Sequence, residues 1–214
     1  MRQLALSRLV KSVLELLLCL VAALGSPAVA LAAPGGLDAG FGNGGLVVTS
    51  FGGTDVASAV VIQPDGKLVV AGRTIIAGNT TFALARYNPN GSLDPAFGAG
   101  GLVTTDFGST DQAFAVGLQA DGRIVTAGRR GSDVIVARHN ADGSLDSLFG
   151  SNGRVITNFG ATEQALALVV QPDGKIVVAG RTNNDGNFDF ALARYEASGP
   201  LDLTFGAAGL VTRA

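Results

Sequence analysis

The chain has 214 residues, of which 47% are apolar and 15% charged, with 31 glycines and a formal net charge of −2. Plentiful aliphatic residues exclude a disordered chain, and this much glycine excludes a coiled coil, so a turn-rich all-β protein is predicted. Mild acidity without a basic stripe argues against nucleic acid as a partner.

The N-terminal region has the layout of a secretory signal peptide. Basic residues precede an apolar run at 16–24, which is much shorter than the roughly 20 residues that a membrane-spanning helix needs. We expect a signal peptide over residues 1–32, and therefore an exported protein, periplasmic or extracellular, with no membrane contact after cleavage. The cleavage sites expected are Ala30, Ala32 or Ala33. The single cysteine, Cys19, lies in this region, so the mature chain is expected to have no thiol.

The remaining chain, residues 37–214, is an array of repeats. Its units begin at Leu37, Leu93, Leu145 and, cut short, at Leu201. Each starts with a segment such as LDAGFGNGGLVVTSFGGTD, continues with an apolar hairpin such as ASAVVIQPDGKLVVAGR, and closes with one such as FALARYNPNGS. Three shared segments in three copies indicate one structural element repeated along the chain.

Every unit predicts four short antiparallel strands. The first two are joined by turns such as Pro64-Asp65-Gly66, where Pro presets φ and Gly accepts a positive φ. The first strand is apolar with small residues, and the fourth is more polar, which is typical of the inner and outer strands of a β-propeller blade. The predicted strands are 57–63, 67–73, 82–88 and 101–107 in blade 1, 113–119, 123–129, 133–139 and 153–159 in blade 2, and 165–171, 175–181, 189–195 and 209–213 in blade 3.

The motifs LDxxFGxxG, DGKIVVAG and FALARYNxxGSLD resemble the delta-60 repeat, a bacterial tandem repeat with a propeller-like fold. This resemblance covers residues 37–214. It implies an architecture and no shared biochemical activity.

The predicted fold is therefore an all-β, partial β-propeller built from about three four-stranded antiparallel blades plus an orphan N-terminal strand at 45–51. Propellers close with four to eight blades. The chain is thus a fragment of a longer array, or copies meet face to face, or the sheets curl into a less regular stack. We expect self-association through the terminal blade faces or through the 45–51 strand, because unpaired strand edges recruit further strands.

Two sets of repeated polar residues are candidate sites. The first comprises Arg86, Arg138 and Arg194 with Asp94, Asp146 and Asp202. These residues are either a ligand-binding rosette or structural Arg–Asp pairs, and the structural interpretation is favoured because all units keep them. The second, Asn140, Asp142 and Asp146, resembles a calcium loop weakly, without the closing Glu of an EF-hand.

The other chemistry-bearing features favour a non-catalytic protein. His139 stands alone where the other units have Tyr87 and Tyr195, which indicates an aromatic filler. No hydrolase, zinc-protease, Walker A or dinucleotide motif occurs, so neither a catalytic residue nor a cofactor is expected. Loops predicted at 74–81 and 182–189 differ between units and are candidates for specificity.

The sequence thus predicts an exported scaffold or binding surface for an unidentified protein or carbohydrate. Two alternatives stay open: a hydrolase or lyase acting in the channel of an assembled propeller, and a remnant of a longer array.

Overall fold

The computed structural model describes residues 35–183 and 186–213. The predicted signal peptide, its cleavage sites and Cys19 lie outside the described residues. Contacts divide the chain into two units, residues 1–38 and 39–214, and every strand of the described residues belongs to the second unit. Among the described residues, none forms a helix long and apolar enough to span a membrane.

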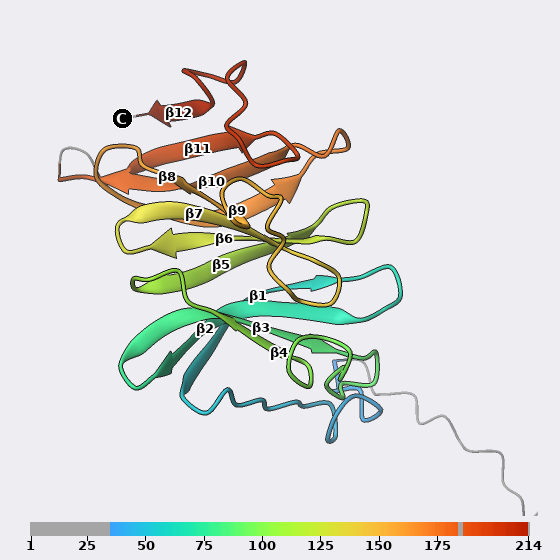
Figure 1. The fold of residues 1–214 in the computed structure, drawn as a ribbon. Helices are drawn as coiled ribbons and strands as arrows, with labels where there is room; N and C mark the ends of the chain where they lie inside the picture. Colours follow the sequence, from blue (N-terminus) through green and yellow to red (C-terminus); the bar gives the residue numbers. More distant parts are fainter. Residues whose placement is uncertain (1–34, 184–185, 214) are drawn as a thin grey trace, which may run out of the picture. The chain divides into compact units, whose positions relative to one another are not determined.

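Within its described residues, the second unit forms three four-stranded antiparallel sheets, the blades, with no helix (Figure 1). Blade 1 contains β1 (Thr54–Ile62), β2 (Leu68–Ile76), β3 (Asn79–Tyr87) and β4 (Leu102–Thr105). Blade 2 contains β5 (Asp111–Leu118), β6 (Ile124–Arg130), β7 (Asp133–His139) and β8 (Arg154–Thr157). Blade 3 contains β9 (Thr162–Val170), β10 (Ile176–Asn183), β11 (Asp189–Tyr195) and β12 (Leu210–Arg213). The predicted all-β class and its three four-stranded blades are confirmed.

Each blade bends at the same place, where a β-bulge interrupts the pairing of its first two strands. In blade 2 the register shifts between Ala113 and Ala115, opposite Gly128. A Cβ built on Gly128 would lie 1.9 Å from the carbonyl oxygen of Gln112, so only glycine allows this close approach. The repeated Ala-Gly-Arg motif therefore encodes a bend in the sheet.

The expected loop at 74–81 is largely a hairpin. β2 continues to Ile76 and β3 begins at Asn79, which leaves only Ala77 and Gly78 in the turn. Both have a positive φ, 52° and 86°, as a type I′ turn requires. In the corresponding 182–189 stretch, Thr182 and Asn183 belong to β10 and Asp189 to β11. The prediction of loops was wrong at these positions because the residues beside each turn pair across the two strands, Ile76 with Asn79 and Thr182 with Asp189, and so extend the ladder.

Two apolar clusters hold the blades against one another. The first joins β2 and β3 of blade 1, through Val69, Ala71, Phe82 and Leu84, to blade 2. The second joins β6 and β7 of blade 2, through Val125, Ala127, Val134 and Val136, to blade 3. The side of a blade that packs on the following blade is called its trailing face. The opposite side, which packs on the preceding blade, is called its leading face. The leading face of blade 2 includes Ala113, Ile124, Ala137 and His139.

Candidate functional site

The repeated arginines and aspartates form an ion pair inside every blade. The Nε atom of Arg86 lies 2.8 Å from Asp94, that of Arg138 2.8 Å from Asp146, and that of Arg194 2.7 Å from Asp202. Each guanidinium also stacks on the phenylalanine of the same unit, at 4.6 to 4.7 Å from the ring centroid. A second cation, Lys67, Arg123 or Lys175, contacts the same carboxylate.

This charge arrangement keeps the aspartates ionised. Burial alone would raise the pKa of Asp146, but the Leu148 amide and the Arg138 guanidinium outweigh it and hold this pKa below its ordinary value. The pKa of Asp202 is lowered chiefly by its hydrogen bond from Lys175. Carboxylates that are held by two cations and by backbone amides serve the framework of the blade.

The arginines also connect successive blades. Arg86 donates from Nη1 to the Ala141 carbonyl of blade 2, and Arg138 donates to the Ala197 carbonyl of blade 3 at 2.7 Å. Arg138 further binds Gln119, whose amide reaches two carbonyls of blade 3. Arg194, in the last blade, bonds within its own unit to Asp202 and Thr204. The set lies along the blade interfaces rather than around one ligand position.

The weak calcium-loop candidate is a hydrogen-bonded turn. Asp142 accepts bonds from the amide and the hydroxyl of Ser144 at 2.9 and 2.6 Å. Asn140 donates to the same hydroxyl, while Asp146 binds Arg138 instead. No group of three His, Cys, Asp or Glu suited to a metal occurs in the described part of the chain. Asn140 and Asp142 therefore share Ser144 as a partner, and Asp146 is held by Arg138.

His139 occupies the interface between blades 1 and 2. It is fully buried, and burial lowers its pKa from 6.5 to about 4. Its Nε2 atom lies 3.5 Å from the hydroxyl of Thr105, which belongs to the outer strand of the preceding blade. Tyr195 contacts Thr157 in the same way at 2.7 Å. The position thus joins blades 2 and 3 to the outer strand of the blade before each.

Sequence reasoning missed one repeated acidic residue, which is Asp55, Asp111 or Glu163. Its carboxylate accepts a bond from the backbone N–H of the phenylalanine four residues earlier, at 2.7 to 2.9 Å. In blades 2 and 3 the acid is fully buried, and this burial raises the pKa of Asp111 and of Glu163. The signal was present in the sequence, because an acid follows the FG pair at the same distance in every unit.

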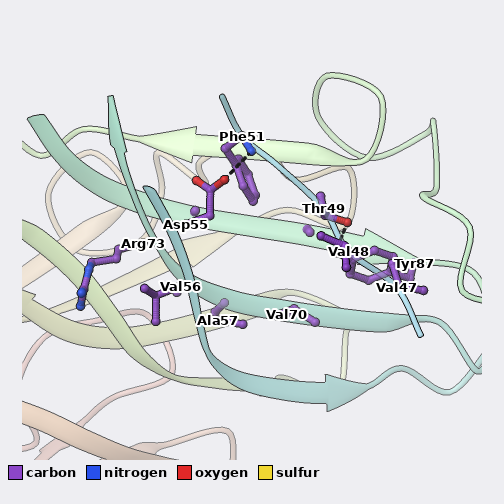
Figure 2. Close-up of a pocket in the computed structure, with 14 residues that line it drawn as sticks. Val47, Val48, Thr49, Phe51, Asp55, Val56, Ala57, Val70, Arg73 and Tyr87 are labelled. Atoms are coloured by element: carbon purple, nitrogen blue, oxygen red, sulfur yellow. Dashed lines mark hydrogen bonds between the residues drawn. The ribbon is translucent and has the colours of Figure 1, made fainter. Parts of the chain in front are cut away.

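A further departure from the repeat is a cavity on the leading face of blade 1 (Figure 2). It measures about 280 Å³ and lies between residues 47–51 and strands β1 to β3. The Tyr87–Thr49 and Phe51–Asp55 hydrogen bonds lie at its walls, with Ala57 and Val70 at its base. A more open hollow of about 460 Å³, lined by Val60, Leu68 and Tyr87 among others, adjoins it.

At the corresponding place in blade 2, the preceding blade supplies the packing. Phe82 and Leu84 of blade 1 lie in one cluster with Ala113 and Ile124 of blade 2. Phe82 also meets Phe107 edge-on, at 5.2 Å between centroids. The hollows on blade 1 therefore mark a surface that the other two blades bury.

Comparison with known families addresses the repeats directly. A model described as a β-propeller domain of unknown function (DUF5122) matches residues 63–97, 119–149 and 171–205. The three blades are β-propeller repeats. Each match runs from the first hairpin turn of a blade, through its second and third strands, to the phenylalanine on which the blade's arginine stacks. A comparison with curated proteins finds no match.

Proposed function

We propose that this protein is an exported, non-catalytic repeat protein of the delta-60 kind that acts as a binding scaffold for another protein surface. The observation that carries the proposal is the exposure of Phe190. Its side chain is 77% exposed on the trailing face of blade 3, whereas Phe82, at the same position of blade 1, is 0% exposed. Large apolar side chains gathered on one surface mark an interaction site.

The opposite end of the array shows the same feature. On the leading face of blade 1, Val60 and Ile62 are 59% and 66% exposed. Their counterparts Val116 and Leu118 pack against the cluster between blades 1 and 2. A surface of aliphatic side chains suits an apolar protein partner better than a carbohydrate, which needs several polar groups to be recognised.

Substitution of the exposed phenylalanine tests the binding function. Cross-linking in the exported fraction should join the wild-type chain to a partner protein, and Phe190→Asp should abolish that product. Leu148→Asp is the matched control, because Leu148 is also exposed but lies in the connection before β8 of blade 2. Equal cross-linking by both variants, with native circular dichroism, would contradict the proposal.

Export is tested separately by the mass of the N-terminal peptide. We expect the exported chain to begin directly after Ala30, Ala32 or Ala33. An intact Met1 terminus in a protein that stays in the cytoplasm would contradict export.

A further inference from the structure

The two ends of the array expose opposite faces of the same repeat. Blade 1 exposes its leading face, where Ala57 is open to solvent although its counterparts Ala113 and Ala165 are fully buried. Blade 3 exposes its trailing face, with Phe190 and Val169. The leading face is buried in blades 2 and 3, and the trailing face is buried in blades 1 and 2. Both are therefore interface surfaces by sequence and shape.

The internal contacts show what these faces pair with. A trailing face packs on a leading face twice in this chain, from blade 1 to blade 2 and from blade 2 to blade 3. The trailing face of blade 3 is therefore complementary to the leading face of blade 1. Phe190 would lie against Ala57, as Phe82 lies in one cluster with Ala113. Arg194 would donate to the Pro89 carbonyl, the counterpart of the Ala141 and Ala197 carbonyls.

Residues 39–51, the N-terminal segment, already occupy part of this interface. Gly42 donates to the Asn90 carbonyl of blade 1 at 2.8 Å, just as Gly98 donates to Asp142 of blade 2. Thr49 accepts the Tyr87 hydroxyl, as Thr157 meets Tyr195. The segment thus lies on blade 1 as the outer strand of a preceding blade would.

The N-terminal segment has no sheet of its own. Among the described residues, Val47, Val48 and Thr49 take part in none of the strand ladders, and Val48 is 96% exposed. Its counterpart in blade 1, Leu102–Thr105, pairs along β3. If residues 46–49 paired in the register of Leu102–Thr105, they would lie along the edge of β11 that pairs with β12 in the single chain.

In a head-to-tail contact only one of these two strands fits between β11 and blade 1. Thr49, Thr105 and Thr157 all present a hydroxyl to the aromatic residue of the following blade. β12 carries Arg213 at this position, which lacks the hydroxyl that Tyr87 binds. The N-terminal segment is therefore the strand that completes the interface.

We propose that a second copy of this chain docks head to tail, with its blade 3 on the leading face of blade 1, and that residues 46–49 replace β12 on β11 of that copy. The proposal rests on the proposed binding function, since it names the partner of the exposed faces. Such a contact is heterologous, because two different faces meet. It forms a closed ring only if the rotations from copy to copy add up to a full turn. Two copies give six blades, within the four to eight that close a propeller.

Light scattering on the purified exported chain tests the contact, and a dimer is expected. Val60→Lys and Phe190→Asp should each weaken dimerisation at least about tenfold, whereas Leu148→Asp should not. A wild-type monomer at micromolar concentration would overturn the proposal, and so would an open series of larger polymers.

Mixing the two variants tests the polarity of the contact. The Val60→Lys chain keeps an intact blade 3 face, and the Phe190→Asp chain keeps an intact blade 1 face. At a protein concentration where each variant alone is monomeric, a one-to-one mixture should therefore form a heterodimer through the one remaining interface. Failure to form it, although the wild-type chain dimerises, would overturn the head-to-tail arrangement.

A disulfide tests the exchanged strand. In the proposed register Val48 lies opposite Ala191 of the second copy, in the place that Thr212 takes now. With Cys19→Ser as background, Val48→Cys combined with Ala191→Cys should give a disulfide-linked dimer on a non-reducing gel, and neither single cysteine should. A dimer by light scattering that yields no such link would overturn the strand exchange.

The two proposals fail differently. If cross-linking captures a different protein on Phe190 and the purified chain is monomeric, the binding function stands and the head-to-tail dimer falls. If the chain neither captures a partner nor associates, both fall.

Discussion

Blade 2 and the two outer blades have nearly the same sequence pattern, yet they differ in what covers them. Blade 2 has a neighbour on both faces, and its Ile124 and Val136 are fully buried. The same positions face solvent in part as Leu68 of blade 1 and Leu192 of blade 3. A repeat array gains stability at its interfaces, so equal side chains should contribute unequally along this chain.

The largest expected difference lies between two phenylalanines. Phe82→Ala removes a buried ring from the first interface and should lower the free energy of unfolding by about 3–5 kcal/mol. Phe190→Ala should cost less than about 1 kcal/mol in the monomer, because the ring is already mostly exposed. Urea unfolding of both variants at one low protein concentration measures the gap. Equal losses would mean that Phe190 is covered in solution.

Replacing the repeated arginines should also destabilise the inner interface more than the exposed end of the array, but by smaller amounts. Arg138→Ala removes a buried guanidinium that pairs with Asp146 and crosses the interface to Gln119 and the Ala197 carbonyl, so we expect a loss of about 2–4 kcal/mol. Arg194→Ala should cost about 1 kcal/mol, because Lys175 still pairs with Asp202 and the site is more open. Thermal unfolding compares the two variants, and a larger loss from Arg194 would contradict the comparison.

Acid should weaken the first interface through His139. Its pKa falls from 6.5 to about 4 on burial, so the folded state favours the neutral ring. That stability is complete above pH 6.5 and is lost as the pH falls towards 4; between pH 7.5 and 5 the loss is about 2 kcal/mol.

His139→Tyr isolates this effect, since tyrosine is the native residue in blades 1 and 3. The raised pKa values of Asp111 and Glu163 act with the opposite sign, because these acids are stabilised in their protonated form as the pH falls. They are present in both proteins and cancel in the difference. Urea unfolding at pH 7.5 and 5 should show a smaller acid loss in the variant, and identical losses would contradict the assignment to His139.

The smallest expected difference concerns the threonine hydroxyls. Thr157→Val breaks the buried 2.7 Å contact with Tyr195 and should cost about 1–2 kcal/mol. Thr49→Val should cost less than about 0.5 kcal/mol, because water can replace the lost partner of the half-exposed Tyr87. Thermal unfolding of the pair checks this order.

Much of the fold could be predicted because the repeat supplied its own alignment. Pro64-Asp65-Gly66 and its counterparts located the first hairpin of each blade, and alternating apolar residues located the strands. Boundaries were displaced where pairing overrides local signals: β1 begins at Thr54, and β2 continues to Ile76 across the expected loop. A tight Ala-Gly turn and its extended ladder depend on the partner strand, which local propensity does not contain.

The candidate site was harder to predict for a related reason. The spacing of Arg138 and Asp146 indicated a pair within a blade, but the bond from Arg138 to the Ala197 carbonyl joins residues 59 positions apart. The buried Asp111 and Glu163 were overlooked because a turn acid after FG is typical of an exposed position. Burial converts such a residue from a solvated turn into a framework element.

The sequence by itself determined the strands, the turns and the number of blades, since glycine positions and apolar alternation act over a few residues. Only the tertiary structure decided which faces are covered, because burial depends on the neighbouring blade: Phe82 lies in one cluster with Phe107 and Ala113, which come well after it in the chain. Phe82 and Phe190 occupy the same position of the motif. Blade 2 buries Phe82, whereas Phe190 stays exposed in the single chain.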